Sequence, residues 1–248
     1  MPPVIDTTMR KIQLGALHVV EKTIRRFSLV GDKEFFDPQE FPWVPVVEAR
    51  WQDIRAELDR VLKERDAIPN FQDISIDQLE LTQDDRWKTF FFYAYGIRNE
   101  ANCRVCPCTA ELIESIPGMT TAFFSILLPK KRLPPHRGPY KGVLRYHLAL
   151  MIPDPASCGI SVGRHQKQWR EGKSLIFDDT YEHEAWNGSD QIRVVLFVDF
   201  RRPLPIPVSF LNDFIIYCIR SSAFVQSGVT RLEQWNERFE AAYHRLSG

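Results

Sequence analysis

The sequence predicts a β-sandwich or jelly roll with helices at both ends. Short strand-like segments separated by turn residues recur between residues 120 and 200, a spacing typical of all-β sandwiches. Helical periodicity is confined to the two ends of the chain. We therefore expect a single domain over 1–248, with a helical and mixed N-terminal extension (1–118), a β core (119–205) and closing helices (206–248).

Residues 10–29 carry apolar side chains at helical spacing on one face and basic side chains on the other. The apolar positions are Ile12, Leu17, Val20, Ile24 and Phe27, and the basic ones are Lys11, Lys22, Arg25 and Arg26. Such a helix either docks on its own domain or lies on a membrane surface. We favour docking here.

Four further segments precede the β core. Residues 45–65 predict a helix whose apolar face comprises Trp51, Ile54, Leu58, Val61 and Leu62. Residues 68–85 are expected to form a long loop that helps to shape a site entrance. Residues 87–95 have the aromatic composition of a strand. Residues 107–116 predict a short helix that ends at Pro117.

Five strands are expected in the β core, at residues 120–128, 143–152, 158–162, 174–177 and 191–200. Pro203 and Pro205 should end the sheet, because proline cannot donate a ladder hydrogen bond. Helices are then expected over residues 207–221 and 229–246.

The composition favours a packed globular protein with no general affinity for nucleic acid. Of the 248 residues, 44% are hydrophobic, and 32 basic residues balance 32 acidic ones, so no net charge attracts a polyanion. The N-terminus lacks the apolar run of a signal peptide, and no segment approaches the roughly 20 apolar residues that span a bilayer. We expect a cytoplasmic protein without a transmembrane segment, for which peripheral membrane contact stays open.

Five cysteines include a cluster at Cys103, Cys106 and Cys108. An odd count without a signal peptide argues against a disulfide framework. The cluster has the spacing of half a zinc site, but the sequence has no second Cys/His pair at the spacing that would complete the four ligands. Free thiols at a helix start are the favoured interpretation.

The candidate chemistry lies between His136 and Asp199. Two histidines 47 positions apart, His136 and His183, each lie at the edge of a strand-like run. Alternation along the strands places Arg145 and His147 on one face, and places Arg193 among apolar neighbours. A guanidinium is costly to bury unless an anion meets it. Two imidazoles near buried cations therefore suggest a metal that holds an anionic co-substrate, although surface histidines and internal ion pairs would give the same pattern.

The motifs in this region resemble those of the aspartyl/asparaginyl β-hydroxylase family. They read HRGP from His136, LRYHL around His147, LIFDDTYEHEAW through His183 and RVVLFVD from Arg193, and the match covers about residues 117–205. The resemblance implies a double-stranded β-helix that uses Fe(II), 2-oxoglutarate and O2. Bacterial relatives in this family include lipid A acyl-chain hydroxylases.

The resemblance also implies roles for individual residues. His136 and His183 match the iron-ligating histidines, and Arg193 matches the arginine that binds the distal carboxylate of 2-oxoglutarate, assisted by Ser125. Arg145 and His147 match residues beside the co-substrate and the substrate. Asp179 resembles a partner that supports the iron site from behind its ligands. Phe177, Trp186 and Phe197 would form apolar walls.

Gly138 and Val143 bear on the substrate. Many iron enzymes carry a carboxylate two residues after the first histidine, whereas Gly138 cannot ligate, as in the animal aspartyl hydroxylases. This favours a polypeptide-type substrate, while Val143 replaces an arginine of those animal enzymes and weakens that case. We expect hydroxylation of an Asp/Asn-like residue or related acidic substrate. The alternatives are a lipid acyl-chain hydroxylase and a non-catalytic anion-binding module.

Overall fold

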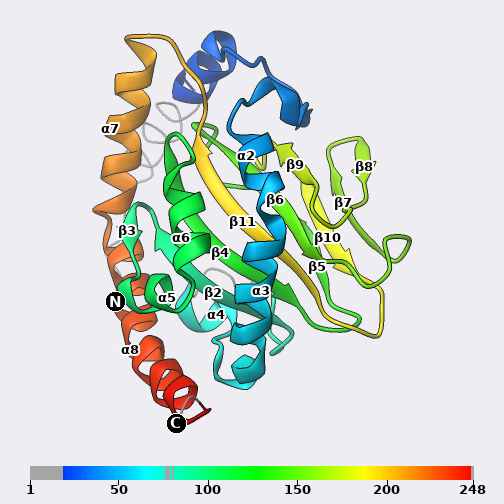
Figure 1. The fold of residues 1–248 in the computed structure, drawn as a ribbon. Helices are drawn as coiled ribbons and strands as arrows, with labels where there is room; N and C mark the ends of the chain where they lie inside the picture. The colour runs from blue at the N-terminus through cyan, green and yellow to red at the C-terminus, as the bar shows by residue number, and fades with distance from the viewer. Residues whose placement is uncertain (1–18, 76–78, 80, 247–248) are drawn as a thin grey trace.

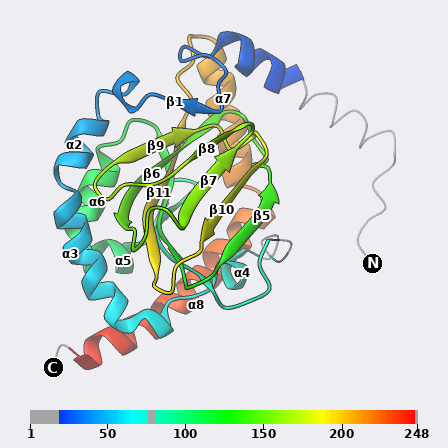
Figure 2. The same ribbon diagram turned by 90° about the vertical axis from the view of Figure 1, so that its right-hand side faces the viewer.

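Two antiparallel β-sheets face each other in the computed structural model, which describes residues 19–75, 79 and 81–246 (Figures 1 and 2). The larger sheet has the order β1 (Phe35–Phe36), β9 (Ser174–Phe177), β6 (Val143–Met151), β11 (Arg193–Arg201), β4 (Met119–Leu127), β2 (Trp87–Ala94) and β3 (Ile97–Arg98). The smaller sheet has the order β5 (Arg132–His136), β10 (His183–Asn187), β7 (Cys158–Val162) and β8 (His165–Lys167). The predicted sandwich of the double-stranded β-helix type is confirmed.

Each of the five strands predicted for the β core is present, as is the aromatic strand β2. The sequence did not reveal β5 and β10 as strands, although they end and begin at the two histidines. β5 contains Pro134 and Pro135, and it lies at the edge of the smaller sheet. An edge strand tolerates proline because one side of it needs no ladder hydrogen bond.

Helices cover the outer face of the larger sheet (Figure 1). They are α2 (Val44–Ala49), α3 (Trp51–Val61), the 3-10 helix η2 (Leu62–Ala67), α5 (Glu100–Val105) and α6 (Pro107–Glu114). The helix predicted over 45–65 is divided at Arg50, and its apolar face is confirmed, because Ile54, Leu58 and Val61 are fully buried. All three cysteines of the cluster are free thiols: Cys103 lies in α5, and Cys106 and Cys108 lie at the start of α6.

Side-chain alternation gives the larger sheet two different faces. On β11, Val194, Leu196 and Val198 pack toward the helices in the main core. Arg193, Val195 and Phe197 alternate with them and point toward the smaller sheet. The same alternation on β6 turns Arg145 toward the smaller sheet. The space between the sheets therefore receives charged side chains as well as apolar ones.

The described part of residues 68–85 includes the short helix α4 (Phe71–Ile74). The Phe71 ring packs edge-on against Trp87, with ring centroids 4.6 Å apart, and also contacts Phe91 and Phe123. This segment closes one end of the space between the sheets. Its predicted contribution to a site entrance stays a prediction.

The helix at the N-terminal end of the described chain spans residues 19–27. Its Ile24 is buried against Tyr140 and Ile216, so the described part of this helix docks on its own domain as predicted. Residues 10–18 of the predicted helix lie outside the described residues.

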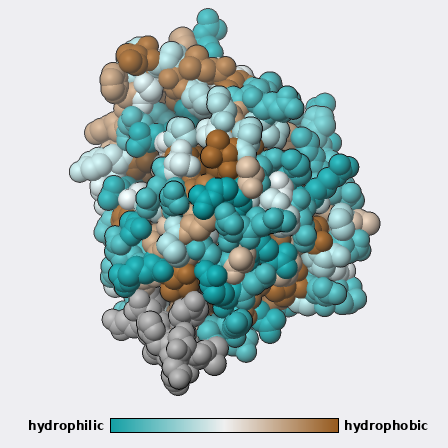
Figure 3. Space-filling model, in the orientation of Figure 1, coloured by the Kyte–Doolittle hydropathy of each residue, from teal (hydrophilic) through white to brown (hydrophobic). Residues whose placement is uncertain are grey.

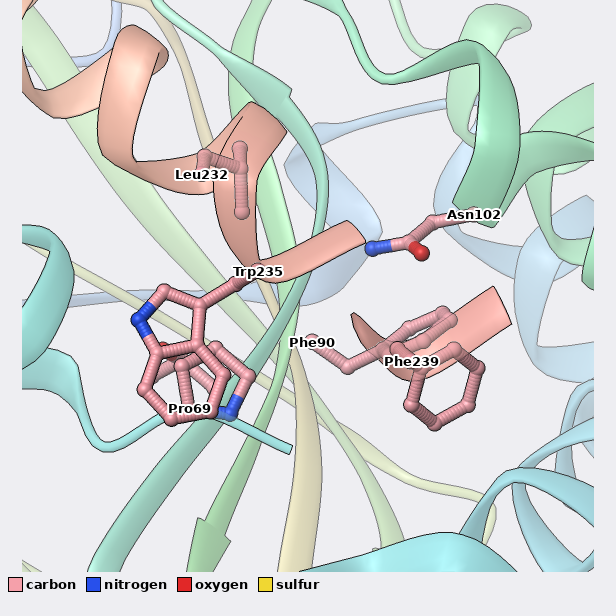
Figure 4. A pocket seen from close by; sticks show the side chains of 7 residues that line it. Pro69, Phe90, Asn102, Leu232, Trp235 and Phe239 are labelled. Atoms are coloured by element: carbon pink, nitrogen blue, oxygen red, sulfur yellow. The ribbon is translucent and has the colours of Figure 1, made fainter. Parts of the chain in front are cut away.

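Two closing helices, α7 (Val208–Arg220) and α8 (Ala223–Leu246), follow β11. Within the described ranges, no single helix is long and apolar enough to cross a bilayer. Helix α7 and the first half of α8 pass that test only together, and they are bent by 57°. A small cavity lies between α8 and β2, lined by Pro69, Phe90, Asn102, Leu232, Trp235 and Phe239 among others (Figure 4). None of the predicted site residues lines it.

Candidate active site

His136 and His183 lie side by side on neighbouring strands of the smaller sheet. They are register partners on β5 and β10, and their ring centroids lie 4.1 Å apart. Two imidazoles this close can share one metal ion. The structure therefore brings together the two residues predicted as metal ligands.

Main-chain carbonyls orient both imidazoles. The Nδ1 atom of His136 lies 2.8 Å from the carbonyl oxygen of Pro134, and Nδ1 of His183 lies 3.0 Å from that of Tyr181. A carbonyl only accepts, so each Nδ1 carries the proton and each Nε2 keeps its lone pair for a metal. The ring of His183 is thus oriented by the main-chain carbonyl two residues earlier.

Burial keeps these rings neutral. It lowers the pKa of His183 to about 3, with a further contribution from the neighbouring His136. Burial is also the main cause that lowers the pKa of His136. Neutral imidazole is the form that binds a metal. Within the described part of the chain, no three or more His, Cys, Asp or Glu residues cluster as metal ligands, so the imidazole pair is the candidate centre.

Asp179 fills the space beside Gly138. A β-carbon added to Gly138 would stand 1.9 Å from the Asp179 Oδ2 atom. The Gly138 N–H donates to the Asp179 carbonyl oxygen over 2.7 Å. Asp179 is buried, and its Oδ1 atom has no hydrogen-bond partner. The Asp179 carboxylate thus lies next to Gly138, although Asp179 is far from Gly138 in the sequence.

Arg145 belongs to an internal ion-pair network. Its guanidinium lies 2.8 Å from Asp179 and 2.9 Å from Asp199, and it stacks over Phe197 at 4.2 Å. Burial raises the pKa of Asp179, and the charge of Arg145 opposes that rise. The sequence left open an internal ion pair as an alternative to a bound anion, and Arg145 forms such a pair. Its predicted role beside the co-substrate stays a prediction.

Arg193 is buried without a carboxylate. It is 1% exposed, its guanidinium lies 4.0 Å from the ring of Trp169, and its Nε has no hydrogen-bond partner. Burial lowers the pKa of Arg193 to about 9. No described side chain forms a salt bridge with it. A buried cation of this kind is the receptor expected for an anionic ligand.

Further unsatisfied polar atoms lie on the same side of the larger sheet. Both ring nitrogens of His147 and the indole nitrogen of Trp169 are buried without partners. The hydroxyl of Thr89 is also unpartnered, but Thr89 lines the cavity beside α8. Burial lowers the pKa of His147 well below its usual value, and the charges of Arg193 and Arg145 lower it further. Buried polar groups are normally satisfied, so this group predicts a polar ligand that fills the space. Trp169 is not among the residues predicted from the sequence, although a lone tryptophan inside the polar stretch 163–173 was a usable signal.

Ser125 lies on β4 between Thr89 of β2 and Val195 of β11. It is buried and accepts a hydrogen bond of 3.1 Å from the indole N–H of Trp87. Because Arg193 is two residues from Val195 on the same face, Ser125 is placed on the neighbouring strand one step from the guanidinium. The predicted pairing of Ser125 with Arg193 is compatible with this register and stays a prediction.

Two of the three predicted apolar walls are present. The rings of Phe177 and Phe197 lie 5.0 Å and 5.1 Å from that of His147. Trp186 does not line the site, because alternation along β10 turns it away from His183. It packs against Gly159 and Arg132 on the outer face of the smaller sheet.

A β-sandwich with two inward imidazoles and an unpaired buried guanidinium defines a protein of the metal-dependent, anion-binding kind. Residues 48–203 match the aspartyl/asparaginyl β-hydroxylase family. The chain belongs to this family, and it is a hydroxylase of the 2-oxoglutarate-dependent, iron-dependent type that the family implies.

Two relatives show how far the similarity extends. An ornithine lipid ester-linked acyl 2-hydroxylase of Rhizobium tropici is 45% identical over 236 residues, which cover 95% of this chain and 84% of that protein. The human aspartyl/asparaginyl β-hydroxylase is 38% identical over 122 residues, which cover 47% of this chain and 16% of that protein. The predicted family is confirmed, and the lipid hydroxylase alternative has more support than the Asp/Asn-like substrate.

Among solved structures, two cupin proteins match part of the chain at low similarity. A Cupin_2 domain of an XRE family transcriptional regulator from Enterobacter cloacae is 10% identical, with a TM-score of 0.33, and the match covers 48% of this chain and 99% of that one. A Cupin 2 conserved barrel domain protein from Salinispora arenicola is 9% identical, with a TM-score of 0.33 over 56% of this chain and 92% of that one.

Proposed function

We propose that this protein is an Fe(II)- and 2-oxoglutarate-dependent hydroxylase that acts on a fatty acyl chain of an ornithine-containing lipid. One observation carries the reaction class. Two adjacent imidazoles, each with its Nδ1 atom at a main-chain carbonyl, lie on one sheet, and the facing sheet presents Arg193, a buried cation without a counter-ion among the described residues.

The residues present fit the iron and its co-substrate. His136 and His183 would hold the metal through Nε2. When bound, ferrous iron with 2-oxoglutarate and O2 supplies an oxidant that can hydroxylate an unactivated C–H bond, with succinate and CO2 as the other products. Arg193 would bind the distal carboxylate through two parallel N–H donors. The unpartnered nitrogens of His147 and Trp169 are further donors or acceptors for the same small dianion.

The chain's own side chains would keep the reacting centre dry and ordered. Phe177 contacts both His147 and His183, with ring centroids 5.0 Å and 5.9 Å apart. Exclusion of water protects a reactive oxidant from side reactions. Arg145 fixes the Oδ2 atom of Asp179, and the unpartnered Oδ1 atom of Asp179 would accept a hydrogen bond from a polar ligand.

The choice of substrate rests on the extent of similarity. The acyl 2-hydroxylase of Rhizobium tropici matches nearly the whole chain, including both flanking regions, while the human relative matches about half of it. A long apolar acyl chain also needs no charged group to bind it. Val143 stands where the animal enzymes carry an arginine, which agrees with a substrate that lacks the aspartyl carboxylate.

A direct comparison of substrates tests the proposal. The purified full chain is incubated with Fe(II), 2-oxoglutarate and either ornithine lipid in mixed micelles or an Asp/Asn-containing peptide. We expect the lipid to gain one oxygen atom on an acyl chain, with one succinate formed per product, and no reaction without iron. Turnover of the peptide with an unmodified lipid would overturn the substrate assignment. Hydroxylation without 2-oxoglutarate would overturn the reaction class.

A further inference from the structure

An apolar surface that the candidate site does not use lies on α7 and on the helix of residues 19–27. Among the described residues, nine of the eleven exposed large hydrophobic side chains belong to these two segments, the turns beside them and the first turn of α8. They are Val19, Phe27, Leu29, Ile206, Phe210, Leu211, Phe214, Tyr217 and Phe224, and we call them the α7 surface. In Figure 3, brown gathers along the top and upper left edge, where Figure 1 places both helices.

The two segments form one continuous surface. Ile24 of the N-terminal helix packs with Ile216 of α7 and with Tyr140 in a buried cluster. The Leu29 N–H donates to the carbonyl oxygen of Pro203, just before α7, over 3.0 Å. The exposed side chains of both segments are therefore held next to each other by buried contacts behind them.

Helix α7 is apolar on both of its faces. Ile216 is buried on the inner face, whereas Phe210, Phe214 and Tyr217 are 63–64% exposed on the outer one. These three residues have i, i+4 and i+7 spacing, so they line one stripe of the helix. A soluble surface rarely carries such a stripe of aromatic side chains, and patches of this kind mark interaction sites.

The same two segments carry exposed basic side chains. Lys22 and Arg26 lie one helical turn apart beside Val19, and Arg220 ends α7; each is exposed. Within the described residues none of these three cations has a carboxylate partner, whereas nearby Arg25 pairs with Asp32 and Arg201 pairs with Asp213. Apolar side chains bordered by free cations are typical of helices that lie in the interface of an anionic membrane.

Helix α7 is hydrogen-bonded to the loop that follows His136. The side chain of Asn212, on the inner face of α7, donates to the carbonyl oxygen of Gly142 over 2.9 Å. It also accepts a hydrogen bond of 2.7 Å from Tyr140. Both partners lie on the loop that leaves β5 directly after His136. A lipid that enters from this side would meet the loop next to the proposed iron ligand.

We infer that the α7 surface inserts into the boundary between headgroups and acyl chains of a membrane that contains anionic lipids. The inference rests on the lipid substrate proposed above and adds the surface through which the enzyme reaches it. A second copy of the chain fits the surface less well. In a two-fold dimer the same face meets itself, so the unpaired cations Lys22, Arg26 and Arg220 of both copies would come together.

Vesicle co-sedimentation of the full chain tests the surface without iron or 2-oxoglutarate. The vesicles contain phosphatidylcholine with about 30 mol% phosphatidylglycerol. We expect the wild type to bind, and Phe210→Ser/Phe214→Ser to bind about tenfold or more weakly, because two aromatic side chains no longer enter the membrane. Val46→Ser, which changes an exposed apolar side chain on α2, is the matched control and should bind as the wild type does.

A second variant tests the charges. Lys22→Ser/Arg26→Ser should weaken binding to the vesicles with phosphatidylglycerol, and added salt should reduce the difference from the wild type. Wild-type binding by the Phe210→Ser/Phe214→Ser variant, with an unchanged thermal unfolding temperature, would overturn the inference. A wild-type dimer that this variant converts to a monomer in sedimentation equilibrium would overturn it in favour of a second copy.

The outcomes separate this inference from the proposed function. If ornithine lipid in micelles is hydroxylated but the wild type does not bind vesicles, the α7 surface is wrong and the substrate assignment stands. If the wild type binds vesicles through this surface but leaves ornithine lipid unmodified, the substrate assignment is wrong and the surface stands.

Discussion

Asp179 and Gly138 occupy complementary space: the carboxylate of the first lies where a side chain on the second would begin, 1.9 Å from its β-carbon position. The missing side chain at residue 138 is therefore a packing requirement. Many iron enzymes of this type place their carboxylate ligand at that position of the chain. Here a carboxylate reaches the same neighbourhood from the loop between β9 and β10.

This relationship predicts that Gly138 tolerates no side chain while Asp179 is present. Gly138→Ala should destabilise the protein by about 1–3 kcal/mol, the usual cost of overpacking, and Gly138→Asp should cost more because it also places two carboxylates together. Urea unfolding measures both. Gly138→Asp/Asp179→Gly should recover much of the lost free energy of unfolding. A Gly138→Asp single variant as stable as the wild type would contradict the packing argument.

Iron binding should depend on both imidazoles. His136→Ala and His183→Ala should each lose stoichiometric Fe(II), because one remaining imidazole holds the ion too weakly. Metal analysis after gel filtration under anaerobic conditions measures this. His165→Ala is the control, since His165 is an exposed histidine on β8, and it should retain iron. Full iron content in His183→Ala would remove that residue from the metal site.

Removal of Arg193 should have opposite effects on binding and on stability. Arg193→Met should raise the KM for 2-oxoglutarate by about 100-fold, because a charge-assisted bidentate pair is lost. The same change should raise the thermal unfolding temperature of the ligand-free protein, because it removes a buried charge that has no counter-ion.

Arg145→Met provides the contrast. Arg145 pairs with Asp179 and Asp199, so its removal leaves two carboxylates without their cation and should cost about 3–5 kcal/mol of stability. Calorimetry of both variants without ligand compares them directly. Equal destabilisation by Arg193→Met and Arg145→Met would show that Arg193 has a structural partner.

Acid should weaken the ligand-free fold from about pH 6.5 downward. Burial lowers the pKa of His136, His147 and His183 in the folded state from an ordinary value of 6.5. The unfolded chain therefore binds protons that the folded chain does not, and the stability present above pH 6.5 is lost as the pH falls. The raised pKa of Asp179 acts in the opposite sense, because its folded form holds a proton to higher pH.

Urea unfolding at several pH values measures this dependence. Each buried histidine should add up to about 1.4 kcal/mol per pH unit to the loss below its unfolded pKa. His147→Phe should give a shallower dependence because one of the three groups is removed. A free energy of unfolding that is flat between about pH 7.5 and pH 5 would contradict the burial of these rings.

The strands with strong alternation could be predicted from the sequence, and with them the side of the larger sheet that carries Arg145, His147 and Arg193. Alternation fixes which side chains share a face, but it does not say which cation has a partner. The pairing of Arg145 with Asp199 depends on register between β6 and β11, which local composition does not specify. For the same reason, the sequence could not show that Arg193 lacks a carboxylate partner.

The histidine strands were harder to predict. β5 is rich in proline and β10 mixes charged with aromatic residues, so neither has the composition of a typical strand. Their pairing comes from tertiary context. Trp169 was missed because it lies in a polar segment, and only the fold turns its ring under the Arg193 guanidinium.

The carbonyls of Pro134 and Tyr181 each belong to the residue two positions before the histidine that they orient. The backbone conformation thus sets the tautomer of both rings, and neither Nδ1 atom needs a side-chain acceptor. The acidic segment around His183 could consequently diverge in charge without altering how either imidazole is presented. A designer could build the same two paired strands into another sandwich and expect both imidazoles to be presented in the same tautomer.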